Sequence, residues 1–178
     1  AGEAGTPVAP EVGAPPPDAP PGVTPGAGGG APAEPAVVRT LDTRLNADLT
    51  ALAAYDALLA VVEDTVAGRG WVSATGSRSL GWTFEFLDVG DGTALTYTVE
   101  ADGTVLVAGP VASLPPGVEV VAIDRARVVV DSDAVIAALD DGATALLRLS
   151  APAAEQIVWT VQAGAEPVTI DATPTLTE

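Results

Sequence analysis

An internal repeat constrains the fold of this chain more than any other feature of its sequence. Residues 56–86 and 133–163 align without a gap at a constant offset of 77 positions (133 − 56), and Trp82-Thr83 falls on Trp159-Thr160. Two of the three tryptophans therefore hold the same place in two copies of one unit. Because self-similarity at a fixed spacing is typical of duplicated structural units, the chain is expected to contain one supersecondary unit twice.

Hydrophobic periodicity predicts the elements of the first copy. Apolar residues recur at intervals of three, four and seven over 46–66, which indicates an amphipathic helix of about five turns that ends at Gly68. Large apolar side chains alternate with polar ones over 82–86 and again over 95–99, so these runs are expected to form a hairpin with one buried face. Shorter strands are expected at 71–74 and 104–107.

The second copy is expected to follow the same order. Asp131 or Ser132 caps a shorter helix that runs to about Leu139. β-Branched and other apolar residues dominate 118–123 and 126–130, which predicts strands there as well. Further strands are expected at 145–149, 159–161 and 168–170.

These elements predict an α+β fold of two repeats, in which each repeat packs one helix on a three- to four-stranded antiparallel sheet. The first repeat is assigned to residues 37–110 and the second to residues 111–178. Residues 1–36 contain 10 of the 16 prolines together with many Gly and Ala, so they are expected to form an irregular linker or tether. A repeat of about 60 residues without metal or disulfide is marginally stable alone, and the two are therefore expected to pack on each other.

The composition excludes most catalytic and metal-binding chemistry. The chain has no Cys and no His, and all seven of its cationic residues are Arg. Catalytic Ser-His-Asp and Cys-His arrangements, Schiff bases on Lys and zinc sites built from thiolate or imidazole are therefore excluded. The net charge of −17 repels phosphate backbones and anionic lipid surfaces, so nucleic acid is not expected as a partner.

Carboxylates are the remaining candidates for acid–base or metal chemistry. A glycosidase or acid protease would need two of them in one cleft, whereas Glu63-Asp64, Asp131 with Asp133, and Asp140-Asp141 fall at helix ends or outer faces. The turn 88–92 contains two Asp, but it lacks the spacing and the distal Glu of a calcium loop. No catalytic, cofactor-binding or metal-binding residue is therefore assigned, and no enzymatic activity is expected.

Trp71 is the one residue assigned to contact with a partner. Its counterpart in the second copy is Arg148, so its ring is not part of the repeated pattern. Trp82 and Trp159, in contrast, alternate with other apolar residues along their strands and are expected inside the core.

The sequence also predicts an extracytoplasmic location. It contains no Met, so Ala1 is expected to follow a removed leader such as a secretory signal peptide. A lipoprotein would carry Cys at its mature N-terminus, and Ala stands at position 1 instead, which leaves either plain secretion or an anchor residue that precedes Ala1. No apolar run reaches the roughly 18 to 20 residues that span a bilayer, so the mature chain is not expected to insert directly into a membrane.

Each copy resembles a PepSY-like domain. The matching residues are Asp56-Ala57, Trp82-Thr83-Phe84 and 98–103 (TVEADG) in the first copy, and Asp133-Ala134, Trp159-Thr160-Val161 and 169–172 (TIDA) in the second. The resemblance covers roughly 50–107 and 126–174. It implies a secreted or envelope module, in some members part of a peptidase propeptide with an inhibitory role, and it implies no catalytic residues.

We therefore expect a non-catalytic, secreted or cell-envelope protein-binding module built from two PepSY-like repeats on a flexible tether. Its partner would be another protein, and it would need no cofactor. The alternative is a structural subunit of an extracellular or membrane-associated assembly, in which residues 1–36 are ordered against neighbouring subunits. Either role can use exposed strand edges, to which another chain can add a strand.

Overall fold

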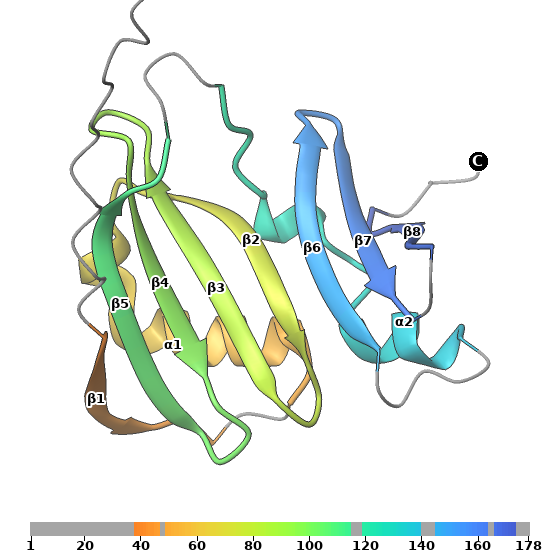
Figure 1. Ribbon diagram of the computed structural model, residues 1–178, viewed down its shortest axis with the longest axis horizontal. Helices are drawn as coiled ribbons and strands as arrows, with labels where there is room; N and C mark the ends of the chain where they lie inside the picture. Colours follow the sequence, from red (N-terminus) through yellow and green to blue (C-terminus); the bar gives the residue numbers. More distant parts are fainter. Residues whose placement is uncertain (1–37, 47–48, 115–118, 140–144, 164–165, 174–178) are drawn as a thin grey trace, which may run out of the picture. The chain divides into compact units, whose positions relative to one another are not determined.

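The described part of the chain forms one antiparallel sheet of eight strands with two α-helices and one short 3-10 helix (Figure 1). The computed structural model describes residues 38–46, 49–114, 119–139, 145–163 and 166–173, so the linker expected over 1–36 lies outside the described residues. Across the sheet the strand order is β1-β5-β4-β3-β2-β6-β7-β8. The elements are β1 (Val38–Arg44), α1 (Ala51–Val66), β2 (Gly70–Ser77), β3 (Gly81–Asp88), β4 (Thr93–Val99), β5 (Thr104–Ala112), η1 (Arg125–Arg127), α2 (Ser132–Ala137), β6 (Leu146–Ala153), β7 (Gln156–Gln162) and β8 (Val168–Asp171).

The expectation of two repeats, each with a helix on a sheet of its own, is wrong. β2 and β6, which come one from each expected repeat, pair with each other in an antiparallel register that places Ser73 opposite Ser150, so the described strands form one sheet. α2 has only six residues, which is too short to cover a sheet as α1 does. Joining the sheets removes two exposed edges and gives both halves one core cluster, which suits units too small to bury a core of their own.

α1 is the amphipathic helix that the periodicity predicts, but it begins at Ala51 and not at residue 46. The hydroxyl of Thr50 accepts a hydrogen bond from the Ala53 N–H at 3.3 Å, and this cap marks the start of the helix. Gly68, with φ at 82°, lets the chain turn away just after the helix, as expected. The apolar face of α1 packs on β2, β3 and β4.

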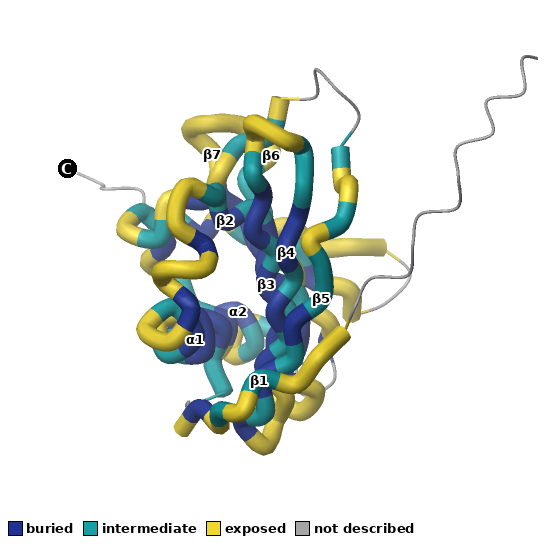
Figure 2. The backbone as a smooth tube through the Cα atoms, turned by 90° about the vertical axis from the view of Figure 1, so that its left-hand side faces the viewer, coloured by how far each residue is buried: buried dark blue, intermediate teal, exposed yellow. Residues whose placement is uncertain are grey.

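The alternation over 82–86 and 95–99 is confirmed, because these runs form the hairpin of β3 and β4. Trp82, Phe84 and Phe86 point to the face that α1 covers, and each is exposed by 2% or less. Figure 2 shows buried stretches of backbone in dark blue along α1 and along the central strands of the sheet. Side chains at the intervening positions point to the opposite face of the sheet, which we call the outer face.

Trp82 and Trp159 lie in similar surroundings within the shared core. Each side chain is fully buried, and each indole N–H donates a 2.8 Å hydrogen bond to the backbone carbonyl two positions before a helix, Leu49 for Trp82 and Val130 for Trp159. The two rings meet edge to face, with centroids 6.1 Å apart and an interplanar angle of 67°. The tryptophans therefore connect the two halves of the sheet directly.

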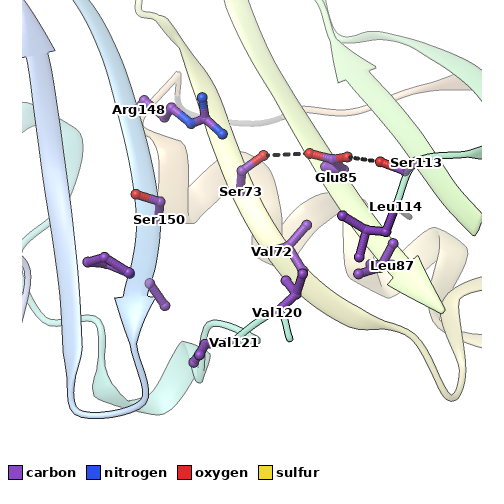
Figure 3. A pocket seen from close by; sticks show the side chains of 12 residues that line it. Val72, Ser73, Glu85, Leu87, Ser113, Leu114, Val120, Val121, Arg148 and Ser150 are labelled. Carbon is purple, nitrogen blue, oxygen red and sulfur yellow. Dashed lines mark hydrogen bonds between the residues drawn. The ribbon is translucent and has the colours of Figure 1, made fainter. Parts of the chain in front are cut away.

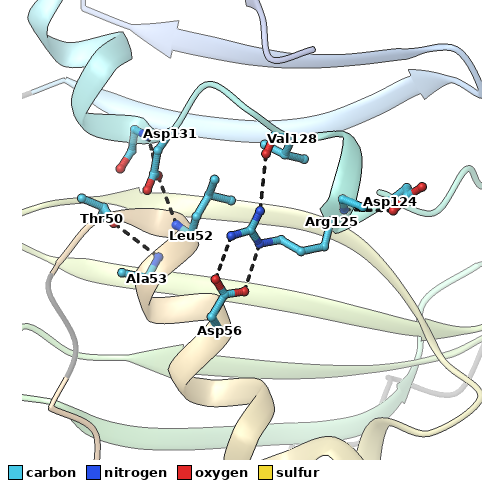
Figure 4. Close-up of polar contacts among 10 residues, drawn as sticks. Thr50, Leu52, Ala53, Asp56, Asp124, Arg125, Val128 and Asp131 are labelled. Carbon is cyan, nitrogen blue, oxygen red and sulfur yellow. Dashed lines mark hydrogen bonds and ion pairs between the residues drawn. The ribbon is translucent and has the colours of Figure 1, made fainter. Parts of the chain in front are cut away.

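The cap and the first residue of α2 hold the N-terminus of α1 (Figure 4). Ser132 Oγ accepts a hydrogen bond from the Ala51 N–H at 2.9 Å, and Asp131 Oδ1 accepts one from the Leu52 N–H at 3.1 Å. Asp131 Oδ1 also accepts the Ser132 N–H at 2.6 Å, so the predicted cap of the second helix is confirmed. Because the first N–H groups of a helix have no partner within it, one pair of residues satisfies donors at the start of both helices.

Arg125 provides a second link between the two halves (Figure 4). Its Nε and Nη2 donate to the two carboxylate oxygens of Asp56 on α1, at 2.9 and 2.7 Å, which is a bidentate ion pair. The hydrogen bonds that Arg125 donates to Asp56 are the main cause of a raised pKa of its guanidinium. Because both side chains are partly exposed, this pair orients the segment more than it stabilises the fold.

The strands predicted at 118–123 and 126–130 are wrong for the residues that the structure describes. Residues 119–131 contain the short helix η1 and no strand. The Asp124 carboxylate accepts the Ala126 N–H at 3.0 Å and starts this turn, and Arg127 donates to the backbone carbonyls of 154 and 155. Ile123 and Val128 belong to the core cluster and Val130 packs against it, so the β-branched character of these three residues reflects burial and not strand pairing.

β2 contains a β-bulge at Val72 that decides which of its side chains reach the outer face. Trp71 lies opposite Phe86 and Ser73 lies opposite Glu85, so Val72 has no partner of its own on β3. Trp71 is therefore buried in the core, while Val72 and Ser73 both line the outer face.

Candidate functional site

A pocket of about 240 Å³ lies on the outer face of the sheet, where β2 and β3 meet β6 (Figure 3). We call it the outer pocket. Its floor is the sheet, and the chain segments on either side of residues 115–118 form another wall. It is lined by Val72, Ser73, Glu85, Leu87, Ser113, Leu114, Val120, Val121, Arg148, Ser150, Ala151 and Pro152.

Glu85 is the one carboxylate among the lining residues of the outer pocket, and two serines fix its position. Ser73 Oγ donates to Glu85 Oε2 at 3.2 Å, and Ser113 Oγ donates to Oε1 at 3.3 Å. Ser73 is opposite Glu85 in the pairing of β2 with β3, whereas Ser113 directly follows β5. The carboxylate is therefore held from both sides and keeps free lone pairs that can accept hydrogen bonds from a ligand.

Arg148 supplies the only positive charge among the lining residues. It lies on β6 opposite Thr75, and its side chain is exposed on the outer face. The guanidinium forms no hydrogen bond or ion pair with any described residue, in a chain that has 24 acidic residues against seven arginines. Figure 3 shows Ser73 between the side chains of Arg148 and Glu85, so the two charges face the same pocket without contacting each other.

Apolar side chains line the rest of the outer pocket. Val72 reaches the outer pocket because of the bulge, and Leu87, which also lines the pocket, is 2% exposed. Leu114, Val120 and Val121 lie on the chain segments beside residues 115–118 and line another side of the pocket. The site thus combines an apolar wall with two opposite charges at its polar side, which is the usual make-up of a small binding site.

The size of the outer pocket suits a small ligand, and its lining holds a single carboxylate. Drug-sized ligands occupy pockets of roughly 300–1,000 Å³, so about 240 Å³ suits a single residue or a molecule of similar size. A glycosidase or an acid protease needs two carboxylates that act together, and only Glu85 is available among the lining residues.

The structure does not bring the carboxylate pairs of the sequence analysis into this pocket. Glu63 and Asp64 are exposed on α1, and Asp131 and Asp133 lie at the start of α2, where Asp131 acts as its cap. Asp140-Asp141 lies outside the described residues. Among the described residues, no three His, Cys, Asp or Glu side chains are grouped closely enough to hold a metal ion.

Local hydrogen bonds occupy one oxygen of each carboxylate in the turn 88–92, and Asp88 also lies 3.9 Å from the guanidinium of Arg69. Asp88 Oδ1 accepts the Gly90 N–H at 2.9 Å, and Asp91 Oδ1 accepts the backbone N–H and the hydroxyl of Thr93 at 2.8 and 2.6 Å. The hydroxyl bond is the main cause of a lowered pKa for Asp91. The same Asp-x-Thr arrangement, with the same effect on the aspartate pKa, recurs at Asp102-Gly103-Thr104 and Asp171-Ala172-Thr173.

Trp71, the predicted partner contact, is 3% exposed and lies on the core side of β2. Its ring stacks on Tyr55 with centroids 4.1 Å apart, and its indole N–H donates to the backbone carbonyl of Ser73 at 2.8 Å. Burial raises the pKa of the Tyr55 phenol, and the nearby Asp56 carboxylate adds to the effect. A contact between Trp71 and a partner stays a prediction, while the two residues that follow it line the outer pocket.

Sequence reasoning missed Glu85, Arg148 and the serines as members of one site. The available signal was local: Glu85 is the charged residue between Phe84 and Phe86 on a strand with one buried face. Nothing in the sequence shows that β6 lies beside β2, which is what brings Arg148 to the same pocket.

Comparison of the chain with protein-family models, with curated proteins and with solved structures finds no match. The resemblance to PepSY-like domains therefore stays a prediction. Within the described part of the chain, no helix combines the length and the apolar character needed to cross a bilayer.

Proposed function

We propose that this protein is a non-catalytic, extracytoplasmic binding module that recognises a protein partner through the outer pocket. The single observation that supports this most is Arg148, a cation left without a described partner in a pocket that also presents a fixed carboxylate. An exposed charge of this kind is stabilised when a ligand of opposite charge binds beside an apolar wall.

The strand edges are weaker candidates for the partner contact than the outer pocket. β1 and β8 form the two edges of the described sheet. The pairing of β1 with β5 is irregular between Thr40 and Arg44, and β1 also carries Arg39 and Asp42. β8 has only four residues. Short, irregular and charged edge strands disfavour the addition of a further strand, so we place recognition on the outer face.

Site-specific photo-crosslinking tests this function. A photoreactive amino acid is placed at Val121, which lines the outer pocket, and separately at Leu80, which is 72% exposed in the turn between β2 and β3. Both proteins are irradiated in the culture supernatant and envelope fraction of the source organism. We expect one protein to be crosslinked from position 121, not from position 80, and to be lost with Arg148→Glu.

Three results would contradict the proposal. Equal labelling from both positions would indicate non-specific contact, and labelling that survives Arg148→Glu would remove the site from the pocket. Crosslinks from position 121 only to further copies of this chain would instead support the alternative role as a subunit of an assembly.

A further inference from the structure

We propose that the outer pocket binds the carboxyl-terminal residue of a partner chain when that residue is Lys or Arg. In this arrangement Arg148 binds the terminal carboxylate, Glu85 binds the side-chain cation, and the aliphatic stem lies against the apolar wall that includes Val72 and Val120. This inference rests on the proposed binding function of the outer face and names the ligand chemistry of the same site.

The distance between Arg148 and Glu85 indicates which kind of ligand can contact both. Glu85 lies opposite Ser73, and Arg148 lies opposite Thr75 on the other side of β2, so the two residues are two strands apart and offset by two positions. With strands about 4.8 Å apart and a rise of about 3.4 Å per residue, their Cα atoms are roughly 12 Å apart. Their side chains face the same pocket from its two sides without an ion pair between them (Figure 3). A ligand that contacts both must therefore carry separated charges of opposite sign.

A carboxyl-terminal Lys or Arg carries this pair of charges within one residue. Its carboxylate and its side-chain cation are separated by a flexible apolar stem, and such stems pack well on apolar surface while the charged head stays at a polar group. The ammonium and carboxylate of a free apolar amino acid share one carbon atom, which is too short a distance to reach both Arg148 and Glu85. A chain terminus also avoids the free α-ammonium group of lysine itself, which Arg148 would repel.

Hydrogen-bonding groups are in place for both ends of such a residue. The guanidinium of Arg148 matches a carboxylate in a bidentate geometry, and Ser150, two residues further along β6, adds a hydroxyl to the same pocket. At the other end, Ser73 and Ser113 orient the Glu85 carboxylate for a cation. The net charge of −17 adds a long-range attraction for a basic partner segment.

Calorimetric titration of the full chain with three short peptides tests the proposal. The probes are acetyl-Ala-Ala-Ala-Lys with a free carboxylate, the same peptide with a carboxyl-terminal amide, and the same peptide with norleucine in place of lysine. We expect the first to bind saturably, and we expect the amide and the norleucine peptide each to bind at least about tenfold more weakly, since each lacks one charge-assisted contact.

Two substitutions assign each charge to its partner. Arg148→Gln should abolish the difference between the acid and the amide peptide, whereas Glu85→Gln should abolish the difference between lysine and norleucine. Arg39→Gln and Glu100→Gln remove the same charges from exposed positions outside the pocket and should leave the binding unchanged. Thermal unfolding of each variant checks that it remains folded.

The proposal fails if the amide binds as tightly as the acid, if free lysine binds more tightly than the peptide, or if no saturable binding appears at about 1 mM peptide. It also fails if the control substitutions weaken binding as much as those in the pocket. Position-specific crosslinking to a partner whose chain ends in another residue would leave the binding function standing and overturn the ligand assignment alone.

Discussion

The edge-to-face contact between Trp82 and Trp159 yields a prediction that tests whether the two halves share one core. The rings belong to β3 and β7, which are separated in the sheet by β2 and β6. We consider Trp82→Phe, Trp159→Phe and the double variant, because Phe keeps an aromatic ring while it removes the indole N–H and part of the buried surface.

The expected cost of each single substitution follows from burial and from one hydrogen bond. Both side chains are fully buried, so the loss of about two methylene equivalents costs about 1.5 kcal/mol at roughly 0.8 kcal/mol each. Loss of the 2.8 Å bond from the indole N–H to the Leu49 or Val130 carbonyl adds about 1 kcal/mol or somewhat more, since the carbonyl loses its donor. Each variant should therefore be destabilised by about 3 kcal/mol, which a domain of ordinary stability tolerates.

The double variant tests whether the two tryptophans belong to one core. Because the rings touch, the two substitutions should not add, and the coupling free energy should be at least about 0.5 kcal/mol. Urea unfolding followed by far-UV circular dichroism measures all three variants without relying on the altered tryptophans. Trp71→Phe is the matched control: its indole N–H is also hydrogen-bonded and its ring is also buried, but it stacks on Tyr55. Additivity of Trp82→Phe with Trp159→Phe, or equal coupling of Trp71→Phe with Trp159→Phe, would refute the shared core.

Three further predictions concern stability. Ser132→Ala should lower the free energy of unfolding by about 1 to 2 kcal/mol in urea titrations, because it leaves a buried N–H at the start of α1 without its acceptor, whereas Ser132→Thr should cost less. Removal of the ion pair by Asp56→Asn or Arg125→Gln should cost only about 0.2 to 1 kcal/mol, and less in high salt; a larger loss would contradict its assignment as a partly exposed pair. Stability should be nearly constant between about pH 6 and pH 9, because no side chain titrates there in a sequence without His, Cys and Lys. Burial raises the pKa of Tyr55 and of Tyr97 above the ordinary value of 10.0, so their contribution to stability is fully present below about pH 10 and is lost as the pH rises through the raised values. On the alkaline side the urea midpoint should therefore fall in that range, and Tyr→Phe variants should reduce the fall.

The sequence predicted those elements whose signal is local. The hairpin of β3 and β4 follows from strict alternation over 82–86 and 95–99, and the start of α2 follows from Asp131, a residue suited to capping. The first helix was predicted too long, because Leu45 and Leu49 continue the apolar spacing although they precede the cap at Thr50. Apolar spacing reports which residues are buried and not where the helical hydrogen bonds begin.

The errors share a different cause, which is pairing between distant parts of the chain. Whether β2 ends a small sheet or continues a large one depends on β6, and a strand's own residues do not specify its neighbour. The same pairing assembles the outer pocket, since it brings Arg148 beside Ser73. Both the fold class and the site were therefore beyond what the periodicity of single segments can show.

The bulge at Val72 determines which side chains of β2 point into the core and which point into the outer pocket. With strict alternation before Ser73, Val72 would point inward and Trp71 outward, so the pocket would lose an apolar wall and the core would lose the ring that stacks on Tyr55. The hydrogen bond from the Trp71 indole to the Ser73 carbonyl spans the bulge and holds it in place. Trp71, which is buried on the core side of β2, is thereby a positioning residue for the site, because the geometry of the Ser73 hydroxyl that orients Glu85 depends on where Trp71 is packed.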